Sequence, residues 1–137
     1  MLYEKVEKGE EDIVFVYTIC GNIEESRSMG FSAIQEKLAI SMDYWITNSI
    51  YPWQNAIQEI SQYVLMFSTQ KSLSSKLVKH IEAEHSYKIP MIAVCKTEMT
   101  NIPYRMWVEN TLIDERKYEI DDGIHNQHDS SSINNLK

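Results

Sequence analysis

Unbroken apolar runs constrain the fold of this chain more than any other feature. They lie within residues 12–18, 56–69 and 91–97, where apolar residues follow one another without polar alternation. A strand with such a run is typical of a sheet that is covered on both faces, whereas a half-exposed strand alternates. Residues 40–47 do alternate, so this segment is predicted to be an edge strand of the same sheet.

Two helical segments separate these strands. The first is predicted to begin at Asn22, because Asn22 and Glu25 have the spacing of a capping box, and to run to about residue 38. The second covers residues 70–84, and a short third helix covers residues 103–112. The order β-α-β-β-α-β predicts an α+β fold, the ferredoxin-like sandwich, with the first and third strands in the centre of the sheet.

An aromatic segment joins the second strand to the third. Tyr51, Pro52 and Trp53 are predicted to form a bend, because proline lacks the amide hydrogen that a central strand requires. The long third strand then begins near Ala56 and ends near Thr69. The chain is expected to reverse its direction at the aromatic residues themselves.

The composition predicts one domain with polar ends. A chain of 137 residues is long enough for one hydrophobic core without a disulfide or a metal. Residues 1–11 form a charged lead-in and residues 12–112 form the domain. Residues 113–137 are polar and few are bulky and apolar, so they are predicted to be a disordered tail.

Charge and hydropathy exclude several partners. The net charge of -7 disfavours a nucleic acid, because phosphate neutralisation requires clustered lysine and arginine. The sequence contains no apolar run of about 20 residues, so no membrane span is expected. The two cysteines form no disulfide framework and residues 1–11 lack a signal sequence, so a cytoplasmic location is expected.

The predicted sheet has one face that its own helices leave open. Two short helices can cover only one side of a four-stranded sheet, yet three of the strands are apolar on both sides. Soluble monomers rarely expose a large apolar patch. We therefore expect this face to be buried in a homo-oligomer.

Four short motifs relate the chain to a known family. They are Glu36-Lys37-Leu38-Ala39, Ser49-Ile50-Tyr51-x-Trp53, His85-x-Tyr87-x-x-Pro90 and Tyr104-x-x-Trp107. With these motifs in this order, the chain resembles the CutA family of divalent-cation tolerance proteins from about residue 14 to residue 112. The resemblance implies a homotrimer of ferredoxin-like subunits with clefts between them.

The chain departs from the family pattern at several positions, of which the resemblance places Gln62 and Ser68 in the cleft. Tyr17 stands where members often carry cysteine, Gln62 where they usually carry glutamate, and Ser68 where they usually carry lysine. The usual His-Pro-Tyr-Glu is His85-Ser86-Tyr87-Lys88. This divergent member is expected to have a less charged cleft.

His85 and Cys20 are the candidate metal ligands. The resemblance places His85 in the cleft, and imidazole together with a thiol would suit a soft divalent cation such as copper. The alternative is that His85 only caps or packs against its helix, and that Cys20 is a surface thiol. Cys95 lies within a predicted strand and is expected to be a small core residue.

The remaining cleft candidates are mostly aromatic. Together with His85, the expected cleft and interface residues are Tyr51, Trp53, Gln62, Ser68, Tyr87, Tyr104 and Trp107. The aromatic members could line a binding cleft or simply pack in a subunit interface, where aromatic residues are enriched. Both roles remain open at this stage.

The sequence contains no recognisable catalytic constellation, neither a nucleophile with its base nor a glycine-rich phosphate loop. We therefore expect a non-enzymatic homotrimer that takes part in the response to divalent metal ions, with weak or indirect cation binding. One alternative is a PII-like regulatory trimer that binds a small ligand in its clefts. Another is a scaffolding trimer that presents its acidic tail to a protein partner.

Overall fold

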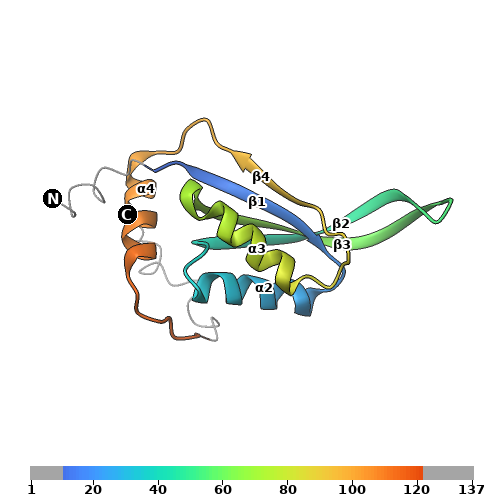
Figure 1. Ribbon diagram of the computed structural model, residues 1–137, viewed down its shortest axis with the longest axis horizontal. Helices are drawn as coiled ribbons and strands as arrows, with labels where there is room; N and C mark the ends of the chain where they lie inside the picture. Colours follow the sequence, from blue (N-terminus) through green and yellow to red (C-terminus); the bar gives the residue numbers. More distant parts are fainter. Residues whose placement is uncertain (1–10, 122–137) are drawn as a thin grey trace.

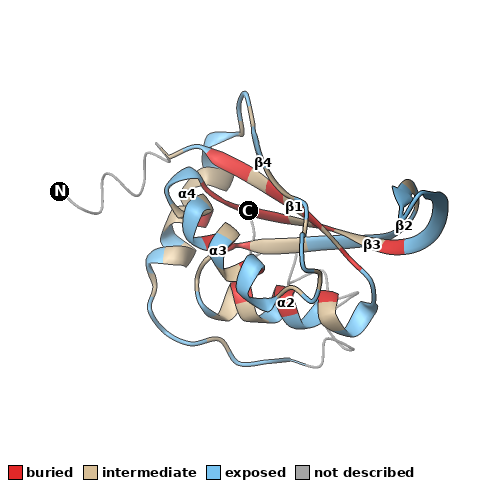
Figure 2. Cartoon of the chain, turned by 45° about the vertical axis from the view of Figure 1, so that its right-hand side comes forward, coloured by how far each residue is buried: buried red, intermediate tan, exposed pale blue. Residues whose placement is uncertain are grey.

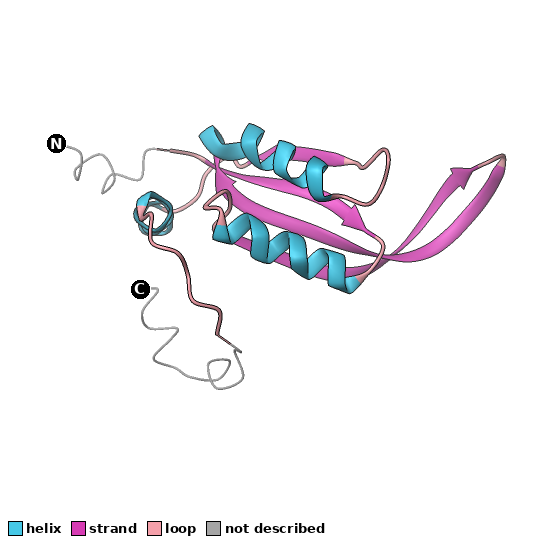
Figure 3. Ribbon diagram, turned by 60° about the horizontal axis from the view of Figure 1, so that its bottom comes forward, coloured by secondary structure: helices cyan, strands magenta, loops and turns pink. Residues whose placement is uncertain are grey.

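The computed structural model describes residues 11–121, which form a four-stranded antiparallel sheet and three α-helices (Figure 1). The elements are β1 (Ile13–Cys20), α2 (Ile23–Gln35), β2 (Ser41–Trp53), β3 (Ala56–Gln70), the 3-10 turn η1 (Lys71–Leu73), α3 (Ser74–Glu84), β4 (Ile92–Lys96) and α4 (Ile102–Ile113). The strand order is β2-β3-β1-β4, and α2 and α3 cover the same face (Figure 3). The predicted ferredoxin-like sandwich is confirmed, with β1 and β3 in the centre.

Both ends of α2 are set by local hydrogen bonds. The side chain of Asn22 accepts a hydrogen bond from the backbone N–H of Glu25 at 2.8 Å, which confirms the predicted cap. The helix ends at Gln35, a few residues earlier than predicted. Lys37 adopts a left-handed conformation with φ of 61°, and the Leu38 N–H returns to a carbonyl of the last turn at 2.9 Å. This closing motif stops the helix.

The predicted bend at Tyr51, Pro52 and Trp53 is wrong. These residues belong to β2, and the chain reverses one residue later, at Gln54 and Asn55, whose φ angles are 49° and 66°. Two consecutive left-handed residues form the turn that matches the twist of a hairpin. Pro52 is accommodated because β2 is an edge strand with one side free of sheet hydrogen bonds.

The hairpin of β2 and β3 extends beyond the rest of the sheet. β1 pairs with β3 only as far as Tyr63, whereas β2 pairs with β3 up to Trp53 opposite Ala56. Residues 47–62 therefore project as an arm (Figure 1), whose distal part is largely exposed in a single chain (Figure 2).

The main core lies between the sheet and the pair α2 and α3. Its buried members are Val16, Cys20, Met29, Ala33, Ala39, Leu65, Phe67, Leu77 and Ile81. Burial alternates along β1: Val14, Val16, Thr18 and Cys20 are buried, whereas the residues between them are only half-buried. One face of β1 is thus fully covered and the other is not, as the two-helix argument predicted.

A smaller core lies beneath α4. Val108 packs there with Ile13 and Ile40, and Phe15, Tyr104, Trp107 and Leu112 surround this group. In Figure 3 α4 lies apart from the layer formed by α2 and α3, near one end of the sheet. Because Ile13 and Phe15 alternate with the residues buried beneath α2 and α3, α4 covers one end of the open sheet face.

The chain after α4 returns along α2 as a strap, which we define as residues 114–121. The backbone N–H of Tyr118 donates to the side-chain oxygen of Gln35 at 3.1 Å, and the side-chain amide of Gln35 donates to the Tyr118 carbonyl at 3.2 Å. The Lys37 ammonium lies 3.4 Å from the centroid of the Tyr118 ring. The strap is the part of the predicted polar tail that the structure describes, and the rest of that tail lies outside the described residues.

Candidate functional site

His85 is held at the end of α3 by two backbone groups. Its side chain is 0 % exposed. The backbone N–H of Tyr87 donates to Nδ1 at 3.1 Å, so Nδ1 must be the unprotonated nitrogen. Nε2 then carries the proton and donates it to the Ile19 carbonyl at 2.8 Å. The imidazole is neutral in this arrangement, and both ring nitrogens have hydrogen-bonding partners.

Cys20 is brought next to this ring. It is the last residue of β1, and its sulfur lies 3.8 Å from Nε2 of His85. Burial, assisted by the negative charge of Glu25, raises the pKa of the Cys20 thiol to about 12, although a hydrogen bond with Ser26 acts in the opposite direction. The thiol is therefore protonated at neutral pH, and it is neither a ready nucleophile nor a ready metal ligand.

The positions of the two cysteines reverse the expectation. Cys20, expected at the surface or as a ligand, is fully buried in the main core, whereas Cys95, expected in the core, is exposed in a single chain. The cause is the register of the sheet: Cys95 lies opposite Phe15, on the face that α2 and α3 leave open. Cys20 lies on the covered face with Val16.

Glu25 ties the first turn of α2 to the segment that follows α3. One carboxylate oxygen accepts a hydrogen bond from the Ser86 N–H at 2.6 Å, and the other accepts one from the Ser86 hydroxyl at 2.9 Å. The carboxylate also lies 3.9 Å from Nδ1 of His85. The sequence indicates only a capping role for Glu25. Its contact with Ser86 joins residues 61 positions apart, so no local sequence pattern predicts it.

Tyr87 connects this cluster to the base of the arm. Its ring lies 4.9 Å from the His85 ring, and its hydroxyl donates to the side-chain oxygen of Gln62 at 2.6 Å. A side chain at Gly21 would place its Cβ 3.2 Å from the Tyr87 hydroxyl, so glycine leaves room for this contact. Burial raises the pKa of Tyr87, with smaller contributions from Cys20, Tyr51 and Glu25. The hydroxyl is thus a stable donor at neutral pH.

The candidate residues fall into three groups within a single chain. His85, Cys20, Tyr87 and Gln62 form the cluster just described. Ser68, Tyr104 and Trp107 lie at the α4 end of the sheet, where the Tyr104 and Trp107 rings are 5.9 Å apart. Tyr51 and Trp53 lie on the arm.

The α4 group has its own hydrogen-bonding environment. Burial and the charge of Asp43 raise the pKa of Tyr104, while hydrogen bonds with Ser41 and Ser68 lower it. Ser68 and Gln62 are six positions apart on β3, which corresponds to about 20 Å of extended strand. One subunit therefore does not bring these two groups together.

The cluster supports hydrogen bonding better than it supports metal binding. Within residues 11–121, no group of three or more His, Cys, Asp and Glu side chains is arranged to hold a metal ion. His85 and Cys20 lie close together as candidate ligands, yet binding through either would require an existing hydrogen bond to break or a thiol with a high pKa to ionise.

The buried thiol leads to a reactivity prediction. In the variant Cys95→Ser, Cys20 is the only thiol, and native protein at pH 8 is expected to react with Ellman's reagent at least about a hundredfold more slowly than a free thiol. Protein unfolded in urea should react completely. A native reaction as fast as that of the unfolded chain would contradict the burial and the raised pKa.

The same shift sets a pH window for stability. The pKa of Cys20 is about 12 in the folded protein and about 8.5 in an unfolded chain, so its contribution is fully present below pH 8.5. This contribution is lost as the pH rises from about 8.5 toward 12. Urea unfolding over this range should show a smaller loss of stability in Cys20→Ala than in the parent.

Comparison with known proteins places this geometry in a family. The family model for CutA1 divalent ion tolerance protein matches residues 14–111.

No described helix is long and apolar enough to cross a bilayer.

Two named relatives are similar over most of the domain. The chain is 28% identical over 99 residues to "Protein CutA 1, chloroplastic" of Oryza sativa, which covers 72% of this chain and 56% of that protein. It is 29% identical over 90 residues to "Divalent-cation tolerance protein CutA" of Thermus thermophilus, covering 64% of this chain and 87% of that protein. The chain thus spans about half of the rice protein's length.

The solved structures agree with the sequence matches. The crystal structure of CutA1 from Oryza sativa has a TM-score of 0.71 and 27% sequence identity, covering 75% of this chain and 95% of that one. The resemblance inferred from the four motifs is confirmed, and the matches do not support a PII-like regulator or a tail-presenting scaffold. Because the family model covers most of the described residues, the chain belongs to the CutA1 divalent ion tolerance protein family.

Proposed function

We propose that this protein acts in the tolerance of divalent metal ions as a non-enzymatic cytoplasmic homotrimer whose cation binding is weak or indirect. Family membership supports the role in metal tolerance. The observation that carries the statement about binding is the arrangement of His85, whose two ring nitrogens are both engaged by backbone groups of the same chain.

The candidate ligands His85 and Cys20 are poorly prepared to bind a divalent cation. A divalent cation such as copper takes neutral imidazole through a free nitrogen lone pair and takes cysteine as the thiolate. In His85 the unprotonated nitrogen already accepts from Tyr87. The neighbouring Cys20 has its pKa raised to about 12, so few molecules carry a thiolate at neutral pH. Both features weaken a metal site at this position.

Ser32, His80 and Glu84 combine the residue types of a catalytic triad, but their geometry differs from that of a triad. A nucleophile activated by histidine needs an imidazole nitrogen that can take its proton and a second nitrogen oriented by an acid. Ser32, His80 and Glu84 lie together, with the Ser32 hydroxyl 2.8 Å from Nε2 of His80 and 2.8 Å from the Glu84 carboxylate. Glu84, however, approaches the same nitrogen, at 3.4 Å, and so does not orient the ring through its other nitrogen. The three side chains therefore form a hydrogen-bonded link between α2 and α3.

Metal titration tests the proposal. Calorimetric titration of the full chain with Cu²⁺ and with Zn²⁺ is expected to show no site with a Kd below about 1 μM. Cys20→Ser and His85→Gln should leave the isotherm unchanged within error, as should His80→Gln, the matched control on the same helix.

Any stoichiometric site with a Kd below about 1 μM would contradict weak binding, and one outcome would place that site at His85 and Cys20. This would be a stoichiometric site with a nanomolar Kd that disappears in both Cys20→Ser and His85→Gln but persists in His80→Gln. Such a result would mean that the cation displaces the backbone partners of His85 and ionises the thiol.

A further inference from the structure

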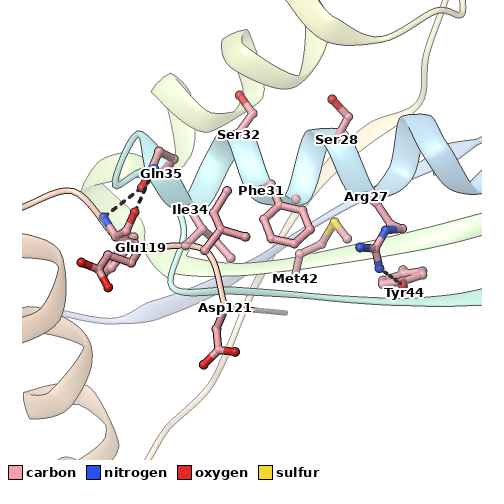
Figure 4. A pocket seen from close by; sticks show the side chains of 13 residues that line it. Arg27, Ser28, Phe31, Ser32, Ile34, Gln35, Met42, Tyr44, Glu119 and Asp121 are labelled. Atoms are coloured by element: carbon pink, nitrogen blue, oxygen red, sulfur yellow. Dashed lines mark hydrogen bonds between the residues drawn. The ribbon is translucent and has the colours of Figure 1, made fainter. Parts of the chain in front are cut away.

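A groove runs along the outer side of α2, away from the cluster around His85. It has a volume of about 660 Å³ and lies between α2, the edge strand β2 and the strap. This volume falls within the range of about 300–1,000 Å³ that is usual for small-molecule sites. Figure 4 shows Phe31, Ile34 and Met42 between an arginine–tyrosine pair at one end and the strap at the other.

The middle of the groove is apolar. Phe31 and Ile34 come from the face of α2 that also carries Arg27, because the positions i, i+4 and i+7 share one side of a helix. Met42 lies opposite, over Gly30: a Cβ at Gly30 would come within 2.7 Å of the methionine methyl group. The glycine thus lets Met42 lie flat on the helix and leaves space above it. Phe31 is 49 % exposed, which is high for a phenylalanine.

One end of the groove is positively charged. The guanidinium of Arg27 lies 5.5 Å from the centroid of the Phe31 ring and donates a long hydrogen bond of 3.5 Å to the Tyr44 hydroxyl. Among the described residues no carboxylate lies within ion-pair distance of Arg27. A guanidinium carries five donors in a planar fork that suits a carboxylate. Two aromatic neighbours, Phe31 and Tyr44, contact this guanidinium.

The other end is closed by the strap. The paired hydrogen bonds between Gln35 and Tyr118 and the Lys37 ammonium over the Tyr118 ring fix this wall. The strap residues Glu119 and Asp121 also line the groove, and their negative charges disfavour an anion near the strap. Arg27 and Gln35 are eight positions apart on α2, about 12 Å along the helix axis. The groove is therefore short and apolar in the middle, and Arg27 at the end away from the strap is the one basic side chain among its lining residues.

We propose that this groove binds a small aromatic carboxylate. The carboxylate is taken by Arg27, and the ring lies on Phe31, Ile34 and Met42 with the strap as its far wall. The charge pattern sets the orientation, since the anion is favoured at Arg27 and disfavoured at Glu119. The length of the groove limits the ligand to about two fused rings with a short acidic side chain.

The test uses two probes that share a naphthyl ring, one with a carboxylate and the other with a neutral hydroxyl group. Full-length protein is titrated with 2-naphthylacetate and with the neutral 2-naphthylethanol, and binding is followed by calorimetry. The acid is expected to bind with a Kd at or below about 1 mM and about tenfold more tightly than the alcohol, because a charge-assisted hydrogen bond is worth about this factor. Arg27→Gln should lower the affinity for the acid to that for the alcohol. Phe31→Ala should weaken the binding of both probes.

A control separates this groove from other exposed apolar surface. Ile57, 81 % exposed on the arm, is replaced by alanine, and this variant should bind both probes as the parent does. Equal affinity for acid and alcohol in the parent, an unchanged preference in Arg27→Gln, or loss of binding in Ile57→Ala would each overturn the proposal. Absence of binding in the millimolar range, as when another segment or a second copy fills the groove, would also overturn it.

Discussion

Light scattering on the purified protein is expected to give three times the chain mass of 16.0 kDa. The factor of three is the homotrimer that the family resemblance implies, and association itself is expected because of the sheet face opposite α2 and α3. Along β1 the residues Phe15, Tyr17 and Ile19 are only half-buried there, and α4 covers one end of this face alone. Trp45, on the same face of β2, is 45 % exposed. Exposed apolar surface of this extent favours association.

A single substitution should break the assembly. Val64 lies in the middle of the open face, in register with Ile19 on one side and Trp45 on the other. In Val64→Glu a carboxylate would have to be buried without a partner, which costs several kcal/mol at each interface. We expect this variant to scatter light as a monomer of 16.0 kDa at micromolar concentration.

The matched control introduces the same charge on the helix layer. Ile23 is 39 % exposed in the first turn of α2, where a negative charge is favoured by the helix dipole. Ile23→Glu should therefore retain the mass of the parent. A parent that is itself a monomer would contradict the covered face, and a mass of two chains would contradict the trimer while leaving the covered face intact.

The strands could be predicted because burial on two faces leaves a direct trace in the sequence. The apolar runs of β1 and β3 identified the centre of the sheet, and the alternation after Ile40 identified the edge. The turn was misplaced because Pro52 is a strong local signal for a break in a strand. On an edge strand, however, the side without sheet hydrogen bonds can accommodate a proline. Asn55, a residue that tolerates a positive φ, was the available signal for the true reversal.

The candidate site was predictable only in part. His85 could be singled out because the family motif and the helix end coincide at that position. Its partners could not, since the Ile19 carbonyl and the Tyr87 amide depend on how β1 and the α3 end meet. The position of Cys20 depends on where β1 ends. The strand was predicted to end at Thr18, but it continues for two more residues, and this places the Cys20 thiol in the core.

Replacing His85 by alanine is expected to lower the free energy of unfolding by about 3–5 kcal/mol. The substitution removes a fully buried ring and leaves two backbone groups without partners, the Ile19 carbonyl and the Tyr87 N–H. The tilted ring contact with Tyr87, with centroids 4.9 Å apart, is lost as well. Urea unfolding at one fixed protein concentration measures the change, because the stability of an oligomer depends on concentration.

Two further variants decide what the ring contributes. His80→Ala removes a histidine from the same helix whose side chain is 21 % exposed and whose contacts with Ser32 and Glu84 lie near the surface, and it should cost less than about 1 kcal/mol. His85→Phe replaces the imidazole with a somewhat larger aromatic ring that can form neither hydrogen bond, and it should still lose about 2 kcal/mol or more. If His85→Phe is as stable as the parent, packing alone holds the cluster. The two hydrogen bonds of the imidazole would then contribute little to the stability of the fold.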